Sequence, residues 1–377
     1  MLSPRWSQNK WQLAHEFGTI YGPEEAQAML EVLNDWAPTC GKRVEEFEEK
    51  FAAYVGAKHA LAASSWVGAA HLAAMAMDIQ PGDEVIVPAL TFCASANIFV
   101  RLGASIAFAE SDPRTFDLDP SRLEEKISPR TKAVVAVHMC GQPCDMDPVL
   151  EIAERHNVLV VQDAAHAPGA EYHGRKLGQM GDFVVYSFQQ CKNISTLGEG
   201  GMVTTNNHEW ADKMRKLRSH GKTVYPGINC RMPDVQGAVG TVQLARLDQH
   251  NHTRRRLAYY LNELLADVEG ITTPYEIPHV KHVYHLYNTV VDEKAIGMSR
   301  DQFIEALWDK EQIRAITQYY PTVNCLPAYR DMGHGEGECP ISEETASTVV
   351  TLPLCPRFNR SDMEELAEGV KRTLRRR

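Results

Sequence analysis

Long apolar runs are missing from this sequence of 377 residues, and their absence excludes several classes of protein. No run approaches the roughly 20 apolar residues that a membrane-spanning helix requires. The first ten residues also lack the apolar core of a secretion signal. We therefore expect a cytoplasmic protein that has no membrane span.

Clustered positive charge is scarce as well. The chain carries 39 Lys and Arg residues against 49 Asp and Glu residues, which gives a net charge of −10. Nucleic-acid binding needs Lys and Arg gathered against phosphates, so we expect no nucleic-acid partner. Two short runs of three arginines, at 254–256 and 375–377, are interpreted as solvated positions on helices.

Cysteine is present, but its pattern indicates neither disulfides nor a metal site. The nine cysteines are odd in number and irregularly spaced, which argues against a disulfide framework and favours a reducing cytoplasm. Cys140 and Cys144 are the closest pair, and the Gly-Gln-Pro between them indicates a turn. No set of His and Cys residues has metal-ligand spacing, so we expect no metal.

Strand-like and helix-like segments alternate over the first two thirds of the chain. Apolar runs typical of buried strands are separated by segments whose apolar residues lie three and four positions apart. The strand candidates are 84–87, 105–109, 132–138, 158–162, 182–187 and 202–205, and the helix candidates are 67–77, 94–102, 147–156 and 209–220. This alternation predicts an α/β fold with a mostly parallel sheet and helices on both faces.

The pattern changes after residue 239. Residues 239–265 form one long amphipathic segment, which we expect to bridge to a second domain. The remainder mixes strand-like and helix-like segments, namely 287–291, 300–311, 343–349 and 362–374. We predict a large domain with an N-terminal arm at 1–250 and a small α+β domain at 251–377. Residues 333–337 carry three glycines and predict a mobile loop.

Lys192 is the most informative single residue. It follows an apolar run, 183–186, that is typical of a buried strand, and a Gly-Glu-Gly-Gly turn at 198–201 leads into a second apolar run. A lysine between buried strands is costly to desolvate unless its charge is neutralised or its amine is used. A Schiff base does both, because it consumes the amine. The alternative is a solvated lysine in a surface loop, which the flanking runs disfavour.

Asp163 follows a second apolar run. Residues 158–162 are typical of a strand in a parallel sheet, and α/β sheets place ligands at the carboxyl ends of such strands. Pyridoxal phosphate requires an acid opposite its pyridine nitrogen, because the carboxylate keeps that nitrogen protonated. The alternative is that Asp163 is a helix N-cap.

These two segments belong to a series of seven that resembles the DegT/DnrJ/StrS family of pyridoxal-phosphate aminotransferases, often called sugar aminotransferases. The resemblance extends from about Gly22 to about Leu374. In order, the segments are 41–48 (GKRVEEFE), 82–88 (GDEVIVP), 91–92 (TF), 141–146 (GQPCDM), the Asp163 segment, the Lys192 segment and 227–232 (GINCRM).

The resemblance implies the aspartate-aminotransferase-like fold (fold type I) and pyridoxal 5′-phosphate as cofactor. It implies transfer of an amino group from glutamate or glutamine to a keto-sugar, sugar nucleotide or keto-cyclitol, in cell-surface sugar or secondary-metabolite (antibiotic) biosynthesis. Gln189 and Gln190 are similar to the aminocyclitol branch of the family. The resemblance also implies a homodimer with shared active sites.

Several residues match family positions that contact the cofactor ring. Lys192 matches the lysine that forms the Schiff base and then moves the proton, and Asp163 matches the partner of the pyridinium nitrogen. The resemblance places His166 near the ring face or the phenolic oxygen, whereas the alternative is a core histidine bonded to backbone. Phe92 matches an aromatic residue that stacks on the ring, with a core phenylalanine as the alternative.

The cofactor phosphate requires hydrogen-bond donors. Ser187 matches a family phosphate ligand, and Asn229 matches a residue that the other subunit supplies. For Asn229 the alternative is a left-handed turn after Gly227. Backbone amides at the start of the 67–77 helix are the third expected donor set, because a helix N-terminus favours an anion.

The chain departs from the family at two places. Trp66 and Val67 stand where most relatives have Gly-Thr, so that either Ser65 compensates for the missing hydroxyl or the phosphate has one bond fewer. Trp66 is also expected to narrow the substrate mouth. Asn324 stands where relatives usually carry a histidine. The resemblance assigns that position to the substrate, together with Arg231 and Tyr320.

Two other functions stay open at this point. A lyase, dehydratase or cyclase acting on an amino-acid-like substrate would use the same cofactor. Family dehydratases, however, replace the lysine with histidine, and the iron–sulfur dehydrases need a cysteine cluster that this chain lacks. A regulatory protein on the same fold would be expected to have lost Lys192 or Asp163, and both are present.

Overall fold

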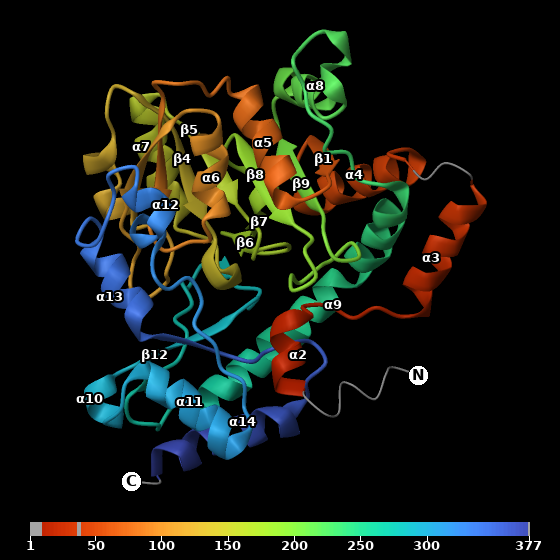
Figure 1. Ribbon diagram of the computed structural model, residues 1–377. Coiled ribbons are helices and arrows are strands. Elements are labelled where there is room, and N and C mark those ends of the chain that lie inside the picture. Colours follow the sequence, from red (N-terminus) through yellow and green to blue (C-terminus); the bar gives the residue numbers. More distant parts are fainter. Residues whose placement is uncertain (1–9, 36–38, 376–377) are drawn as a thin grey trace.

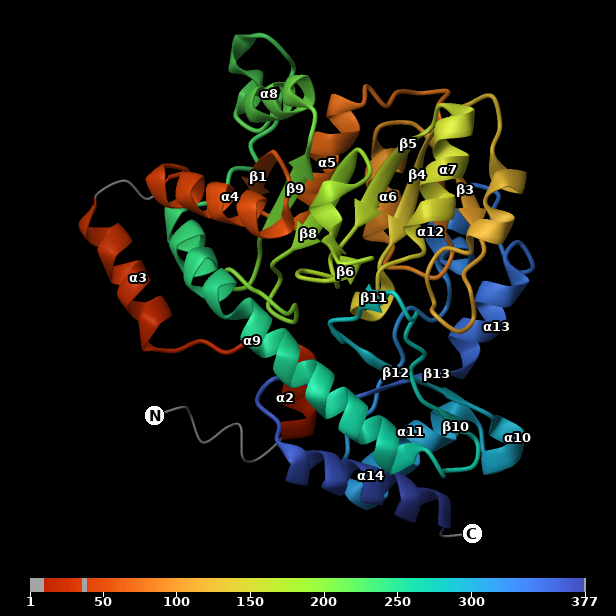
Figure 2. The ribbon, with the colours of Figure 1, turned by 180° about the vertical axis from the view of Figure 1, so that it is seen from behind.

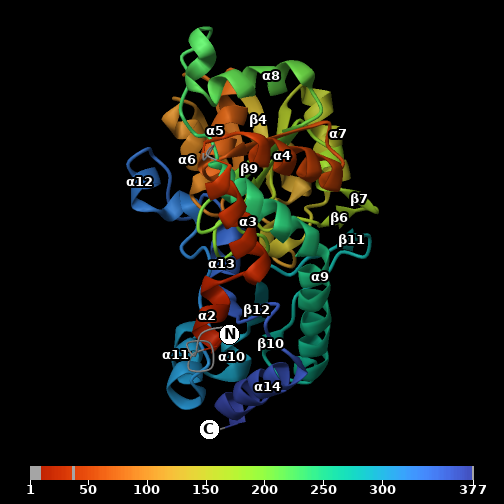
Figure 3. The same cartoon turned by 90° about the vertical axis from the view of Figure 1, so that its right-hand side faces the viewer.

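The computed structural model describes residues 10–35 and 39–375. The chain forms a large part around a central sheet and a small part beside it, and the long helix α9 (Asp234–Leu265) runs from one to the other (Figures 1 and 2). Figure 3 shows that the molecule is elongated along this direction. Within the described ranges, no helix has both the length and the apolar character needed to cross a membrane.

The central sheet has seven strands in the order β1-β9-β8-β5-β4-β2-β3. From β8 to β3 all neighbours are parallel, and β9 is antiparallel to both β1 and β8. The strands are β1 (His59–Ala63), β2 (Glu84–Pro88), β3 (Ser105–Ala109), β4 (Thr131–Val137), β5 (Leu159–Asp163), β8 (Phe183–Ser187) and β9 (Gly201–Thr205). The predicted mostly parallel sheet is confirmed, and the six predicted strands agree to within one residue at each end. β1 was not predicted, because three of its five residues are alanine, which carries little strand signal.

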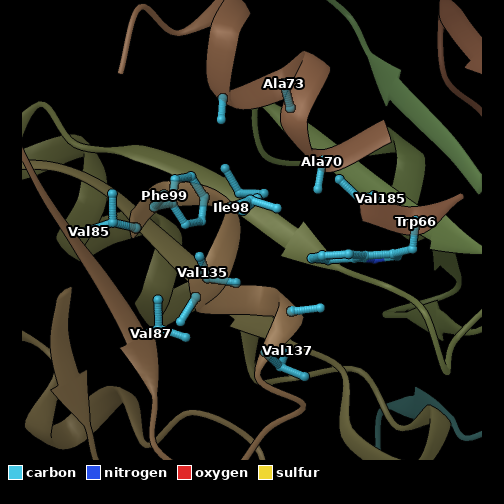
Figure 4. Packing of buried hydrophobic residues seen from close by; sticks show 14 of the residues in the cluster. Trp66, Ala70, Ala73, Val85, Val87, Ile98, Phe99, Val135, Val137 and Val185 are labelled. Atoms are coloured by element: carbon cyan, nitrogen blue, oxygen red, sulfur yellow. The ribbon is translucent and has the colours of Figure 1, made fainter. Parts of the chain in front are cut away.

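Successive side chains of these strands enter two different apolar layers, because side chains alternate across a sheet. Val85 and Val87 of β2 lie in one layer, and Ile86 between them lies in the other. Figure 4 shows the first layer, where Val85 and Val87 lie near Ile98 and Phe99. Burial on both faces explains why the strands appear in the sequence as continuous apolar runs.

Helices cover both layers. Residues of α5 (Trp66–Ala76), α6 (Ala94–Arg101) and α8 (His208–Leu217) belong to the first layer, and residues of α4 (Lys42–Val55), α7 (Met146–His156) and α9 belong to the clusters of the opposite face. The four predicted helices correspond to α5, α6, α7 and α8. Helix α3 (Pro23–Asn34) packs along α9 at the edge of the molecule (Figure 1).

The small part has an apolar core of its own, to which both ends of the described chain contribute. Trp11 of α2 (Lys10–Glu16) packs on Phe358 with ring centroids 5.1 Å apart. The other elements are α10 (Glu293–Ile296), α11 (Arg300–Glu311), α14 (Arg360–Arg375) and a sheet of β10 (Ile271–Thr272), β12 (Tyr287–Val291) and β13 (Val349–Leu352). The predicted segments 287–291, 300–311 and 362–374 are confirmed as β12, α11 and α14, and 343–349 is the end of a helix that leads into β13.

Segments beyond residue 250 also pack on the large part. Tyr329 of α12 (Pro327–Arg330) contacts Phe108 at 5.3 Å between ring centroids and donates a hydrogen bond to Asn97. Ser342 of α13 (Pro340–Thr348) donates to Glu110 at 2.7 Å. A third sheet joins β11 (Val280–Lys281) to β6 (Glu171–Tyr172) and β7 (Arg175–Lys176). The division of the chain at residue 250 therefore stays a prediction, since these contacts cross it.

The interpretation of the arginine run 254–256 as solvated is wrong for its first member. Arg254 is 1% exposed, Arg255 is half-buried and pairs with Glu276 at 3.1 Å, and Arg256 is exposed. A helix with partners on two sides presents adjacent residues to different environments, because each residue turns by about 100°. Of the other run, Arg376 and Arg377 lie outside the described residues.

Candidate active site

A cavity of about 450 Å³ opens at the carboxyl ends of the central strands. The last residues of β5 and β8, Asp163 and Ser187, line it, and Lys192 enters from the loop after β8. From the small part, Leu352 of β13 and Tyr319 complete the wall. The parallel arrangement brings these strand ends together, since every parallel strand ends at the same edge of the sheet.

Asp163 is buried at the inner end of this cavity. Its carboxylate accepts hydrogen bonds from the Ser95 hydroxyl at 2.7 Å and from the Ala165 amide at 3.0 Å. Burial raises the pKa of Asp163, and these two donors and the nearby charge of Lys192 act in the opposite direction. The helix N-cap alternative does not apply, because the residues after Asp163 form turns rather than a helix.

Lys192 lies in a loop that buried polar contacts hold. Its own amide donates to the Gln189 carbonyl at 2.8 Å. The next residue, Asn193, is buried and bonds to Asn251 at 2.9 Å and to His285 at 3.1 Å. Burial is the main cause that lowers the pKa values of His166 and His285, and the Lys192 charge adds to it. Lys192 lines the same cavity as both rings. Lys192 is therefore held in the cavity and is not a solvated loop residue.

His166 is buried beside Lys192, and its ring has one hydrogen-bond partner within the described chain, Tyr319. Burial, with the Lys192 charge added, holds the pKa of His166 well below its usual range, so the ring is neutral near pH 7. Nε2 lies 2.9 Å from the Tyr319 hydroxyl, whose pKa is raised well above its usual value by burial and which therefore keeps its proton. A neutral imidazole and a protonated phenol share this bond, and either group can be its donor. Among the described residues Nδ1 has no hydrogen-bond partner.

Phe92 is exposed to the cavity. Its side chain is 59% exposed although the residues around it in the sequence are mostly buried. The ring contacts Tyr319 edge-on, with centroids 6.3 Å apart. The alternative of a core phenylalanine is wrong, because Phe92 lines the open space.

Helix α5 begins at the edge of the same cavity. The Ser65 hydroxyl caps it by accepting from the Gly68 amide at 3.1 Å, and its own proton stays available to donate. The amides of Trp66 and Val67 are in the first turn and have no carbonyl one turn before them. Gly201 is required beside this turn, because a Cβ there would lie 2.4 Å from the Ser65 carbonyl oxygen.

Trp66 does not lie at the mouth of the cavity. The side chain is 9% exposed and packs into the first apolar layer, where Figure 4 shows it near Val137 and Val185. Trp66 instead forms part of the inner wall of the cavity, so the expectation that it narrows the substrate mouth is wrong. Val67 is 47% exposed and faces the open space.

Comparisons with known proteins agree with this arrangement. The model of the DegT/DnrJ/EryC1/StrS aminotransferase family matches residues 20–371. GDP-perosamine synthase from Caulobacter vibrioides is 40% identical over 359 residues, which cover 93% of this chain and 95% of the synthase.

The chain belongs to the DegT/DnrJ/EryC1/StrS aminotransferase family.

Solved structures extend the comparison to the fold and the cofactor. The structure of S. venezuelae DesV in complex with a ketimine intermediate superposes with a TM-score of 0.89 at 35% identity, covering 94% of this chain and 95% of DesV. The PLP-form of the putative sugar aminotransferase Spr1654 from Streptococcus pneumoniae gives 0.89 at 25% identity, covering 95% and 97%. The protein is therefore a pyridoxal-phosphate-dependent aminotransferase of the sugar aminotransferase family, with the expected type I fold.

The residues of the cavity fit pyridoxal phosphate. Nδ1 of His166 is buried without a hydrogen-bond partner among the described residues, and the Phe92 ring is exposed to the same cavity. The carboxylate of Asp163 is available for a cationic partner, and the first turn of α5 presents free amides. Each feature is costly in the isolated chain and is satisfied by a planar, anionic, nitrogen-containing ring.

Four of the residues assigned from the family lie away from the cavity wall in the single chain. Asn229 is exposed and accepts from Arg231 Nε at 3.1 Å. Tyr320 is 50% exposed, with the Arg300 guanidinium 4.3 Å from its ring centroid. Asn324 is fully buried and donates to Glu343 at 2.8 Å and to the Gly335 carbonyl at 2.9 Å. Its contacts hold the loop 333–337, and none involves a residue of the cavity.

Four residues with contacts in the cavity were not anticipated from the sequence. Ser95 bonds to Asp163, Tyr319 bonds to His166, the tilted ring of His285 lies beside His166 with ring centroids 4.3 Å apart, and Arg254 reaches the wall from α9. Tyr319 directly precedes Tyr320, and nothing local distinguishes the two. The sequence marks His285 and Arg254 only by their position, because each is a polar residue next to apolar residues at strand or helix spacing.

Proposed function

We propose that this enzyme transfers an amino group from glutamate or glutamine to the ketone carbon of a sugar, a sugar nucleotide or a keto-cyclitol. The ketone oxygen leaves as water, and another water molecule supplies the keto oxygen of the 2-oxo acid that the donor becomes. The observation that carries the proposal is the meeting of Lys192, Asp163 and His166 in one cavity, in a chain of the sugar aminotransferase family.

Pyridoxal phosphate, when bound, supplies a ring that withdraws electrons from the carbon bearing the amine. Lys192 is proposed as the residue that binds the cofactor covalently and, once released, moves the proton at the reacting carbon. Asp163 is proposed to hold the proton on the pyridine nitrogen, with Ser95 and the Ala165 amide keeping its carboxylate oriented.

His166 is proposed to donate its Nδ1 proton to the phenolic oxygen of the cofactor. The support is that the Tyr319 hydroxyl engages Nε2, while the buried Nδ1 has no hydrogen-bond partner among the described residues. Phe92 is proposed to stack on the ring, because an aromatic face exposed to the cavity gains most when another ring covers it.

The cofactor phosphate is assigned to the start of α5 and the end of β8. The amides of Trp66 and Val67 and the hydroxyls of Ser65 and Ser187 are the proposed donors. Ser65 compensates for the missing family threonine in this proposal, because its proton is not used by the cap. A helix N-terminus adds a partial positive charge that favours the phosphate.

The remaining assignments concern a second subunit and the substrate. We propose a cytoplasmic homodimer in which Asn229 of one chain contacts the phosphate of the other. The exposed position of Asn229, outside its own cavity, supports this assignment. Arg231, Tyr320 and Asn324 are proposed to be near the substrate in the dimer, and the proposed domains are 1–250 and 251–377. We place the reaction in cell-surface sugar or secondary-metabolite (antibiotic) biosynthesis.

The test is a paired screen of donors and acceptors. The holoenzyme is incubated with glutamate or glutamine and a panel of keto-sugars, nucleotide-linked keto-sugars and keto-cyclitols, and products are read by mass spectrometry. The expected product has one nitrogen more and one oxygen less than the acceptor, and 2-oxo acid forms in equal amount from the donor. Lys192→Ala protein is the control for uncatalysed exchange. Loss of water or ring closure without nitrogen transfer would instead indicate a lyase or cyclase.

A further inference from the structure

Arg254 is a buried cation that forms no ion pair within the described chain. It is 1% exposed, the largest side chain of those that are fully buried. By contrast, Arg218, also buried, forms an ion pair with Glu48. Burying an unpaired charge is costly, so a side chain held this way is expected to serve a purpose beyond packing.

The two terminal nitrogens of the guanidinium donate to backbone carbonyls from three separate segments, whereas Nε has no partner among the described residues. Nη1 lies 3.2 Å from the Tyr284 oxygen, 3.3 Å from that of His285 and 3.1 Å from that of Leu354. Nη2 donates to the Gly18 oxygen at 2.6 Å. The first two carbonyls precede β12, the third follows β13, and Gly18 belongs to the N-terminal segment between α2 and α3, which lies beside α9 in Figures 1 and 2.

Gly18 in turn lies directly on the loop that carries Lys192. Its amide donates to the Gln190 carbonyl at 3.0 Å. A Cβ at Gly18 would lie 2.0 Å from the Cys191 oxygen and 2.3 Å from the Lys192 oxygen, closer than any side chain allows. The N-terminal segment therefore has a glycine where the backbone of the lysine loop is in contact with it.

We propose that Arg254 is a positioning residue for Lys192. Its hydrogen bond to the Gly18 carbonyl holds the N-terminal segment against the backbone of residues 190–192, and this contact fixes the loop relative to the small part. The proposal rests on the proposed role of Lys192. Neither Arg254 nor Gly18 needs to touch the reacting atoms.

Arginine suits this position better than lysine does. The planar guanidinium of arginine carries five N–H donors in fixed directions, whereas the ammonium group of lysine is a compact charge with three N–H donors. Burial lowers the pKa of Arg254 to about 10, which leaves the group charged near pH 7 and its hydrogen bonds charge-assisted. One side chain thus joins all three segments.

Two variants test this contact, one at Arg254 and the other at Gly18. Arg254→Met removes the guanidinium and keeps an unbranched apolar chain, and Gly18→Ala forces the segment and the loop apart without touching Arg254. Arg256→Met is the matched control on an exposed position of the same helix. Gly335→Ala is the matched control for the glycine, because no atom lies within 4 Å of the added Cβ.

Two measurements are made on the holoenzyme. Hydrogen–deuterium exchange is followed in peptides covering residues 17–20 and 189–193, together with peptides of β2 and α14 as references. The rate at which hydroxylamine removes the cofactor is measured by absorbance. Loss of a charge-assisted hydrogen bond predicts about tenfold to hundredfold faster exchange at 17–20 and 189–193 in both variants. Cofactor removal should accelerate in the same two proteins, and neither control should change.

The outcomes separate a positioning role from general stability. Faster exchange in the two peptides, with the reference peptides unchanged, supports the proposal. Unchanged exchange at 189–193 in Gly18→Ala would overturn it, whatever Arg254→Met does. If hydrogen exchange in Arg254→Met is faster in all peptides, including the reference peptides, the result for Gly18→Ala decides whether the proposal holds. Neither measurement uses turnover, so the result is independent of whether the substrate screen succeeds.

Discussion

The Tyr319 hydroxyl lies 2.9 Å from His166 Nε2, and this bond joins positions 153 residues apart in the chain. Tyr319 follows α11 of the small part, whereas His166 follows β5 of the central sheet. The bond engages Nε2 and restrains the ring, whereas the buried Nδ1 has no hydrogen-bond partner among the described residues. One hydroxyl of the small part thereby constrains a histidine of the cavity.

Replacing Tyr319 with Phe removes that constraint and leaves the ring in place. Loss of one neutral hydrogen bond, about 0.5–1.5 kcal/mol, predicts a fall in kcat of about twofold to tenfold, with a smaller change in KM. Steady-state kinetics give both constants, and ¹⁵N NMR of the histidines reports the tautomer. Tyr329→Phe is the control, since it loses a comparable bond, to Asn97, outside the cavity. An unaltered kcat in Tyr319→Phe would contradict the role given to this bond.

Lys192→Ala should abolish both covalent attachment of the cofactor and amino transfer. The reason is that an alanine has no amine to bind the cofactor or to carry the proton. Wild-type holoenzyme is reduced with borohydride and digested, and mass spectrometry of the peptides locates the label, which is expected on Lys192. Lys310→Ala, on α11, is the control. A label on any other lysine would remove Lys192 from the site.

Asp163→Asn should slow the reaction while the protein stays folded. The amide is neutral and cannot hold a proton on the cofactor nitrogen as a carboxylate does. Loss of one charge-assisted interaction, roughly 1.5–3 kcal/mol, corresponds to about one to two decades in kcat. Asp182→Asn is a matched control, because Asp182 also accepts a backbone amide and also has a raised pKa, but lies outside the cavity. Equal kcat values in the two variants would mean that Asp163 has only a structural role.

A mixing experiment tests the shared site. Lys192→Ala and Asn229→Asp chains, each impaired alone, are mixed under conditions that exchange subunits. If Asn229 serves the partner's site, one site of each mixed dimer carries both changes and the other carries neither, so activity should return towards half of wild type per mixed dimer.

The control for that experiment mixes Lys192→Ala with Asp163→Asn. Both residues line the cavity of their own chain, so every site of the mixed dimer is damaged and no recovery is expected. Demonstrated exchange without recovery in the Asn229 mixture would exclude Asn229 from the partner's phosphate site.

The stability of the protein should depend on pH through His138. Burial lowers the pKa of His138 to about 4, and its ring is held neutral between the Cys144 amide at 3.0 Å and Gln162 at 3.0 Å. A histidine whose pKa is lowered by folding contributes stability above its unfolded pKa of about 6.5, and this contribution is lost as the pH falls towards the folded pKa. At pH 5 the loss is about 2 kcal/mol.

Urea unfolding at pH 7 and pH 5 measures this contribution. His138→Asn cannot be protonated in this range, so the stability difference between wild type and variant should shrink by about 2 kcal/mol between the two pH values. The raised pKa values of Asp117 and Asp163 act in the opposite direction, but they are common to both proteins and cancel in the difference. A constant difference would show that folding does not shift the pKa of His138.

The sequence by itself determined six of the seven strands of the central sheet, their alternation with helices, and the strand ends that meet at the cavity. A strand buried on both faces must be apolar along its whole length, which is why β2, β4, β5 and β8 were visible as continuous runs. Polar residues directly after such runs, Asp163, Ser187 and Lys192, were then marked as site residues, because the edge of a parallel sheet brings strand ends together. The local sequence pattern was sufficient wherever the structure depends on residues that are neighbours in the chain.

Tertiary structure alone decided which distant side chains complete the cavity. Tyr319 and Tyr320 are adjacent and chemically alike, yet one bonds to His166 and the other is half-exposed beside Arg300. Likewise Arg254 and Arg256 share one helix, and only the first is buried, because the small part and the N-terminal segment close over that face. Such choices depend on how two cores pack, and packing between segments hundreds of residues apart leaves no periodic signal in the sequence.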